Sequence, residues 1–185
     1  MTTPERIFSN LLPHPLDTPK TGKAYAPSNI ALSKYWGNRA AALHLPLNSS
    51  LSISLGTWGT QTQIAPADQD KLIFNGEDLP PDDPAARKGW RFVELFAGAH
   101  RAKLTITTEI SIPTAAGLAS SASGFAALTL ALNEAFDTQL SKDVLSMLAR
   151  FGSGSATRSF WHGFVRWNKG QAPDGRDSYG HPVAG

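Results

Sequence analysis

Short runs of alternating apolar and polar residues predict strands over much of the chain. Residues 51–55 read Leu-Ser-Ile-Ser-Leu, which is the two-residue period of a strand with one buried face. Runs rich in strand-forming residues cover positions 23–26, 51–57, 60–65, 72–74, 104–110 and 163–167. Asn75-Gly76 directly follows one of these runs and is a strong turn signal.

Helical periodicity marks three longer segments. After Pro84, residues 85–100 place Trp90, Val93 and Phe96 on one face, as an amphipathic helix requires. Residues 124–136 and 141–151 predict two more helices, the second with Ser141 as its N-cap. Strands followed by helices mixed with strands indicate an α+β fold. We expect one domain over residues 22–185, preceded by a mobile or loosely docked extension at residues 1–21.

The composition excludes several function classes. Among 185 residues, 17 are Lys or Arg and 15 are Asp or Glu, and the basic ones are scattered, so no nucleic-acid partner is expected. The chain has no Cys, which excludes a disulfide scaffold and a thiolate metal site and fits a cytoplasmic location. No apolar stretch approaches the ~20 residues that cross a bilayer. Because no signal pattern opens the sequence either, we predict a soluble protein without a membrane partner.

The segment Pro113-Thr-Ala-Ala-Gly-Leu-Ala-Ser-Ser-Ala-Ser-Gly124 lies where a predicted strand gives way to a predicted helix. Backbone N–H groups at a helix start lack internal partners, and the helix dipole adds positive character there. Small residues let an anion approach the backbone, and hydroxyls add donors, so the segment is suited to cradle phosphate. It is neither a Walker loop nor a dinucleotide fingerprint. The alternative is a helix whose small residues let a neighbouring element pack closely.

Two further clusters combine hydroxyl, glycine and basic residues. Lys34 and Tyr35 lie in Ala26-Pro-Ser-Asn-Ile-Ala-Leu-Ser-Lys-Tyr-Trp-Gly37 and offer a point charge and a rigid donor suited to a diphosphate. An interfacial aromatic residue beside a solvated Lys is the alternative. Ser153, Ser155 and Arg158 lie in Gly152-Ser-Gly-Ser-Ala-Thr-Arg-Ser159, where accessible backbone donors and a guanidinium fork favour carboxylate or phosphate. There the alternative is a capped helix start with a surface Arg.

These motifs, together with Leu45-Pro-Leu-Asn-Ser-Ser50, give the chain a family resemblance. It resembles the N-terminal part of the diphosphomevalonate decarboxylases, within the superfamily of galactokinase, homoserine kinase, mevalonate kinase and phosphomevalonate kinase (GHMP kinases). The likeness runs from about residue 22 to residue 178. It implies a ribosomal protein S5 domain 2-like N-terminal domain with a left-handed βαβ crossover. It also implies that the family's C-terminal ferredoxin-like domain is absent from this sequence.

The resemblance implies roles for individual residues. Arg158 would orient the carboxylate that leaves as carbon dioxide, and Ser121 would lie nearest the β- and γ-phosphates of ATP. Substrate contacts would come from Lys34, Tyr35, Trp36, Gly37, Asn38, Arg39, Arg87, Ser153, Gly154, Ser155, Ala156, Thr157 and Arg158. Nucleotide contacts would come from Ala116, Gly117, Leu118, Ala119, Ser120, Ser121 and Ser123. Asn38 stands where the family usually has Lys, so either Arg39 supplies that charge or the diphosphate is held more weakly.

The reaction implied by the resemblance is ATP-dependent decarboxylation of mevalonate 5-diphosphate to isopentenyl diphosphate, a lyase step of isoprenoid biosynthesis. ATP and Mg²⁺ are the expected cofactors, and the five His lack the spacing of a further metal site. The family's catalytic Asp belongs to the second domain, so we expect this chain alone to be chemically incomplete and its full-length parent to be a homodimer.

Other functions stay open at this point. One is a non-catalytic, truncated domain that binds nucleotides or anions. The others are a mevalonate 5-phosphate decarboxylase and a mevalonate 3-kinase, because such relatives share the phosphate loop.

Overall fold

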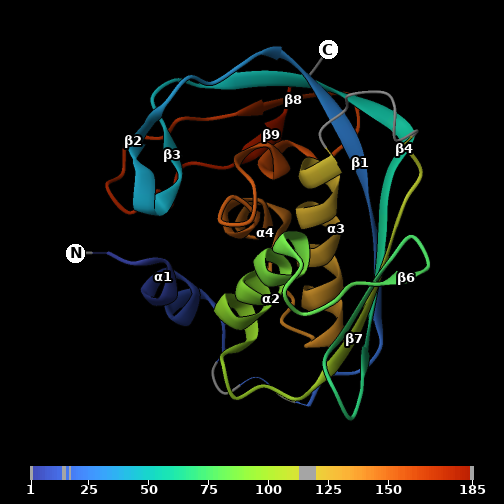
Figure 1. Ribbon diagram of the computed structural model, residues 1–185. Coiled ribbons are helices and arrows are strands. Elements are labelled where there is room, and N and C mark those ends of the chain that lie inside the picture. The colour runs from blue at the N-terminus through green and yellow to red at the C-terminus, as the bar shows by residue number, and fades with distance from the viewer. Residues whose placement is uncertain (1, 14–15, 17, 113–119, 184–185) are drawn as a thin grey trace.

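One mixed sheet curves around a group of helices in the computed structural model, which describes residues 2–13, 16, 18–112 and 120–183 (Figure 1). The strand order is β6-β5-β7-β4-β8-β9, and β1 also pairs with β4. These strands are β1 (Gly22–Ser33), β4 (Ser50–Pro66), β5 (Lys71–Phe74), β6 (Glu77–Asp78), β7 (Leu104–Ile110), β8 (Phe164–Trp167) and β9 (Gly180–Pro182). A separate small pair joins β2 (Asn38–Ala40) to β3 (Leu45–Pro46), with the 3₁₀ turn η1 (Ala41–Leu43) between them.

The long strand β4 organises the sheet. It pairs with β1 over most of its length, with β7 near its end, and with β8 at its start, where Ser50 lies opposite Trp167. Side chains alternate across a strand, so every second residue of β4 faces the helices. Ser50, Ser52 and Ile64 are buried on that inner face. One strand therefore supports both a polar region at its start and the hydrophobic core at its end.

The helices are α1 (Pro4–Leu11), α2 (Pro84–Ala97), α3 (Ser120–Ala135) and α4 (Lys142–Ala149), followed by the 3₁₀ turn η2 (Gly154–Arg158). Asp83 caps α2 and Ser141 caps α4 through backbone N–H groups of the first turn. Helix α3 lies directly on β1: a Cβ at Gly22 would come within 2.5 Å of the Ala131 carbonyl oxygen. The absence of a side chain at Gly22 therefore allows helix and sheet to pack closely.

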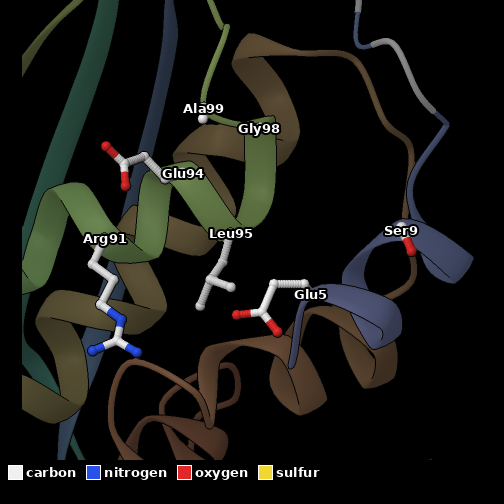
Figure 2. Close-up of a pocket in the computed structure, with 7 residues that line it drawn as sticks. All are labelled: Glu5, Ser9, Arg91, Glu94, Leu95, Gly98 and Ala99. Atoms are coloured by element: carbon white, nitrogen blue, oxygen red, sulfur yellow. The ribbon is translucent and has the colours of Figure 1, made fainter. Parts of the chain in front are cut away.

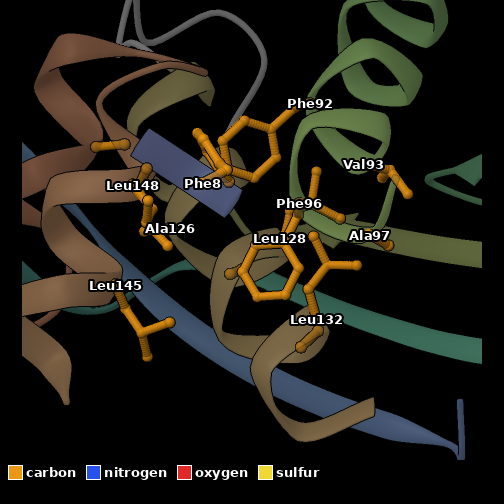
Figure 3. Close-up of a cluster of buried hydrophobic side chains, with 14 of the residues drawn as sticks. Phe8, Phe92, Val93, Phe96, Ala97, Ala126, Leu128, Leu132, Leu145 and Leu148 are labelled. Carbon is orange, nitrogen blue, oxygen red and sulfur yellow. The ribbon is translucent and has the colours of Figure 1, made fainter. Parts of the chain in front are cut away.

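Helix α1 contributes an aromatic side chain to the core. The Phe8 ring is 1% exposed, and its centroid lies 6.0 Å from that of Phe92 and 6.4 Å from that of Phe96 (Figure 3). It also lies 5.4 Å from the centroid of Phe151. Edge-to-face pairs at such distances are favourable beyond the area they bury. Where the sequence predicts an extension, the structure has a docked helix. Mobility of residues 1–21 in solution stays a prediction.

Most predicted elements are present, with different bounds. The two runs at residues 51–57 and 60–65 form a single strand, β4, and the predicted helices correspond to α2, α3 and α4. Asn75 and Gly76 have the positive φ values that a tight turn requires. The sequence did not predict α1, β2, β3, β6, β9 or η2. No helix in the described ranges is both long and apolar enough to span a bilayer.

We predict that Phe8→Ala lowers the free energy of unfolding by about 3–5 kcal/mol, because it removes a buried ring among aromatic partners. Leu32→Ala is a suitable control, since Leu32 is largely exposed on β1, and its effect should stay within about 0.5 kcal/mol. Urea denaturation measures both values. A Phe8→Ala variant as stable as the control would show that α1 is undocked in solution.

Candidate anion-binding site

A row of serine hydroxyls connects the start of α3 to the start of η2. Ser121 Oγ lies 3.4 Å from Ser153 Oγ, which lies 3.0 Å from Ser155 Oγ. Ser153 occupies the N-cap position of η2, yet its side chain makes no capping hydrogen bond. Its hydroxyl is directed to the neighbouring serines instead. The predicted residues Ser121, Ser153 and Ser155 are thus brought together.

Arg158 ends η2 with its side chain in the protein interior. The residue is 2% exposed, and its Nη1 donates a 2.6 Å hydrogen bond to Ser50 Oγ. Its buried Nε has no hydrogen-bond partner, and none of the ion pairs among the described residues includes Arg158. Burial lowers the pKa of the guanidinium to about 10, against the opposing influence of Tyr35. A buried cation without a carboxylate is costly, and an anionic ligand would offset that cost.

A second guanidinium, that of Arg150, is buried nearby in the chain but has a different role. Its Nη1 donates to the carbonyl oxygens of Gly175 (3.0 Å) and Ser178 (2.6 Å), which fixes the loop before β9. Burial, followed by the charge of Arg39, lowers its pKa to about 10. Arg150 thus stabilises a loop, whereas Arg158 has a single hydroxyl partner among the described residues.

Tyr35 and Trp167 form an aromatic wall against η2. Their ring centroids lie 4.7 Å apart in an edge-to-face arrangement. A Cβ at Gly154 would come within 2.7 Å of Tyr35 Oη and 3.0 Å of the Trp167 ring, so glycine is required for this close approach. The Trp167 indole N–H donates to Ser178 Oγ, which connects the wall to the loop that Arg150 holds. Predicted residues Tyr35 and Gly154 therefore lie together.

Two asparagines belong to this region although they were not predicted as site residues. Asn29 Nδ2 donates to Ser159 Oγ (2.7 Å) and to the Ser155 carbonyl oxygen (3.3 Å), and so connects β1 to η2. Asn48 accepts from the Trp36 backbone N–H and donates to the Lys34 carbonyl oxygen, which fixes the turn after β1. Both residues lie inside the quoted sequence motifs. The sequence signal that could have found them is their position, because each Asn stands directly next to an apolar run.

The basic segment after β1 is mostly exposed. Lys34, Gly37 and Asn38 are exposed, and Trp36 is 76% exposed. Arg39 Nη2 donates to the carbonyl oxygens of Lys169 (3.2 Å) and Ala172 (3.1 Å). In this arrangement the Arg39 guanidinium holds a loop, and its contact with a diphosphate stays a prediction.

Other predicted site residues face the interior. The Ser123 hydroxyl lies 2.8 Å from Ser28 Oγ and 2.7 Å from Thr60 Oγ1, so it joins α3 to the sheet. Ala156 and Thr157 are fully buried, and Thr157 Oγ1 donates to the Gly154 carbonyl oxygen. These contacts favour packing roles for all three side chains.

Part of the predicted phosphate loop cannot be placed. Ala116, Gly117, Leu118 and Ala119 lie outside the described residues, and of Ser120 only its helical backbone is described. Their contacts with a nucleotide stay predictions.

An apolar cavity of about 230 Å³ lies beside the start of α3. Its walls come from β5, β7, α2 and α3 and include Leu72, Ile106 and Phe125, with Ser121, Lys88 and Thr108 as polar members. Lys88 Nζ lies 5.0 Å from the centre of the Phe125 ring. The sequence prediction chose the neighbouring Arg87, which is exposed on α2. Lys88 is thus the basic residue of α2 that lines this cavity.

A larger groove of about 460 Å³ separates α1 from α2 and contains none of the predicted residues (Figure 2). Its charged members Glu5, Arg91 and Glu94 carry opposite signs. Hydrogen bonds from its own backbone N–H and from Thr3 lower the pKa of Glu5. The groove therefore offers no concentrated charge for an anion. Within the described ranges, no cluster of His, Asp and Glu could hold a metal ion.

Comparison with known proteins identifies the family of the chain. Residues 26–180 match the family model of the diphosphomevalonate decarboxylase-like N-terminal domain. The diphosphomevalonate decarboxylase of Candida albicans is 41% identical over 174 residues, which are 86% of this chain and 48% of that protein. The chain thus spans about half the length of the curated relatives it matches.

Solved structures of mevalonate diphosphate decarboxylases are also similar to this chain over about half of their length. The mevalonate diphosphate decarboxylase of Staphylococcus aureus superposes with a TM-score of 0.79 at 43% identity, covering 92% of this chain and 52% of that one. A structure described as MDDEF in complex with MVAPP, AMPPCP and magnesium superposes with a TM-score of 0.78 at 40% identity, covering 89% and 51%.

We predict that Arg158→Met raises the free energy of unfolding of the ligand-free chain by about 1–2 kcal/mol, because it removes a buried and unpaired charge. Arg150→Met should instead lower it by about 1–3 kcal/mol, since two carbonyl oxygens would lose their donor. Acetate, used as a simple carboxylate probe, should raise the melting temperature of the wild type and leave that of Arg158→Met unchanged. Equal acetate shifts in both proteins would contradict a carboxylate site at Arg158.

Proposed function

The chain belongs to the family of diphosphomevalonate decarboxylase-like N-terminal domains, and we propose that it is the N-terminal part of an enzyme that converts mevalonate 5-diphosphate to isopentenyl diphosphate with ATP. The whole enzyme's activity and substrates are proposals, because the sequence covers 48% of its Candida albicans relative. A homodimeric parent and a cytoplasmic location belong to the same proposal. So does the S5 domain 2-like assignment, which the parallel pairing of β5 and β7 across α2 supports.

The observation that carries the proposal is the buried Arg158 guanidinium next to Ser50, without an acidic partner. A planar fork of donors suits a carboxylate, and mevalonate 5-diphosphate has a carboxylate at one end. A diphosphate at the other end requires hydroxyl and cationic donors, which Ser153, Ser155 and Lys34 can provide. One substrate thus accounts for the separate groups of the site.

The cavity beside α3 would receive the adenine base of the nucleotide. The apolar walls of the 230 Å³ cavity suit an adenine base, and Ser121 lies where the phosphates would meet the start of α3. ATP supplies the phosphoryl group that makes the C3 oxygen of the substrate a good leaving group, and Mg²⁺ neutralises part of the triphosphate charge. Phosphate oxygens and the Ser121 hydroxyl would be ligands of Mg²⁺.

The protein residues would act mainly by positioning and by charge. Arg158 would hold the substrate carboxylate in line with the breaking carbon–carbon bond. Ser153 and Ser155 would hold diphosphate oxygens, while Tyr35 and Trp167 would close one side of the site. We assign no acceptor for the C3 hydroxyl proton within these residues, and the resemblance implies an Asp in a C-terminal ferredoxin-like domain.

Product analysis tests the proposal. Incubation of the full-length parent with ATP, Mg²⁺ and mevalonate 5-diphosphate should release inorganic phosphate, carbon dioxide and isopentenyl diphosphate in equal amounts. Phosphate transfer without carbon dioxide would instead indicate a 3-kinase. Turnover with mevalonate 5-phosphate but not with mevalonate 5-diphosphate would indicate a mevalonate 5-phosphate decarboxylase. Binding without turnover would indicate a non-catalytic domain.

We predict that Ser121→Ala lowers the affinity of this chain for Mg²⁺·ATP about tenfold, because one phosphate contact is lost. Its thermal stability should remain that of the wild type. Ser111→Ala is the counterpart: the Ser111 hydroxyl accepts from the Gly59 N–H and donates to the Gly59 carbonyl, so its removal should reduce stability but not ATP affinity. Calorimetric titration and thermal unfolding measure both quantities. Identical behaviour of the two variants would favour a packing role for the start of α3.

We predict that Asn38→Lys tightens binding of mevalonate 5-diphosphate several-fold, since one accessible charge contact contributes roughly 1 kcal/mol. The Arg39 guanidinium donates to two loop carbonyl oxygens. We therefore expect that it leaves the diphosphate without this charge contact, which the new lysine of the Asn38→Lys variant would supply. Binding of mevalonate 5-phosphate should change less, because it has less charge to neutralise. If Arg39→Ala weakens diphosphate binding while Asn38→Lys has no effect, Arg39 supplies the charge after all.

A further inference from the structure

Ser50 is the first residue of β4 and lies beneath the site. It is 2% exposed, and its register partner on β8 is Trp167, whose ring supports Tyr35. Its hydroxyl receives the 2.6 Å hydrogen bond from Arg158 Nη1, although the two residues are 108 positions apart in sequence. A strand within a sheet is a rigid support, so Ser50 offers a fixed acceptor.

The Arg158 side chain needs such a support. It projects from η2, a 3₁₀ turn of five residues, into the interior, where packing restricts the side chain but does not satisfy its donors. Its Nε has no hydrogen-bond partner, and no ion pair among the described residues restrains it. Among the described residues, the bond to Ser50 is therefore the one hydrogen bond that holds the guanidinium.

We propose that Ser50 is a positioning residue, which holds the Arg158 guanidinium in the orientation that meets the substrate carboxylate. This inference rests on the proposed function, because it assumes that Arg158 binds that carboxylate. Ser50 touches the guanidinium and acts on the ligand through it. An orientation fixed before binding spares the ligand the entropy cost of ordering the side chain.

The same strand provides a matched control. Ser52 lies two residues further along β4 on the same buried face, and it is fully buried. Its Oγ has no hydrogen-bond partner in the described structure. Ser50→Ala and Ser52→Ala therefore remove the same atom from the same strand, but only the first removes a contact with Arg158.

The experiment compares two ligands in calorimetric titrations of the chain. Mevalonate 5-diphosphate has the carboxylate, whereas isopentenyl diphosphate has the diphosphate without it. Ser50→Ala should lower the affinity for mevalonate 5-diphosphate roughly tenfold, as expected for losing a hydrogen bond to a charged group. Its affinity for isopentenyl diphosphate should stay within about twofold. Ser52→Ala should bind both ligands like the wild type, and Ser50→Thr, which keeps the hydroxyl, should recover most of the loss.

Equal losses for both ligands in Ser50→Ala, or no loss for either, would overturn the positioning role. If Ser50→Ala does not fold, Ser50→Cys keeps the size of the side chain with a weaker acceptor and should show a smaller loss of the same selectivity. A Cys variant without that selectivity would equally overturn it. A wild-type chain that binds neither ligand would contradict the proposed function itself, and the inference with it.

Discussion

The burial of the Arg158 guanidinium without a carboxylate beside it is the constraint on which the site depends. The fold keeps a cation out of water with a single hydroxyl acceptor, Ser50 Oγ, among the described residues. Structural arginines are normally satisfied by several acceptors, as Arg150 is partly satisfied by the carbonyl oxygens of Gly175 and Ser178. Both arginines have buried nitrogens without a partner, but Arg150 holds two loop carbonyl oxygens, whereas Arg158 contacts one hydroxyl next to the serine row.

The surrounding structure keeps this cation in place. Strand β4 supplies the acceptor, η2 supplies the arginine, and the Tyr35–Trp167 pair occupies the space against Gly154. Ser153, the N-cap residue of η2, lies 3.4 Å from Ser121 at the start of α3. Elements that are distant in sequence thus meet around one short 3₁₀ turn. The aromatic contact of Phe8 with Phe151 extends the support to α1, which lies outside the residues that match the family model.

The sequence predicted regular elements better than contacts. Alternation and capping signals were enough for β4, α2 and α4, because these depend on local patterns. Helix α1 was missed although Thr3 caps it and Pro4 opens its first turn, because the helix is short and Phe8 packing in the core stabilises it. The family resemblance assigned Ser121 to the nucleotide and Ser153 and Ser155 to the substrate, and the structure brings the three hydroxyls together. The Ser50–Arg158 bond, and the attachment of Arg39 to a loop, join residues more than 100 positions apart and have no local signal.

The central claim is that Arg158 is a preoriented, unpaired cation that a carboxylate ligand completes. Nitrogen-15 NMR of the arginine side chains tests it most directly, with the Arg158 Nε–H signal assigned by its loss in Arg158→Met. Mevalonate 5-diphosphate should shift this signal downfield and slow its exchange with water, while isopentenyl diphosphate should leave it nearly unchanged. The same response to both ligands, or none to either, would contradict the account.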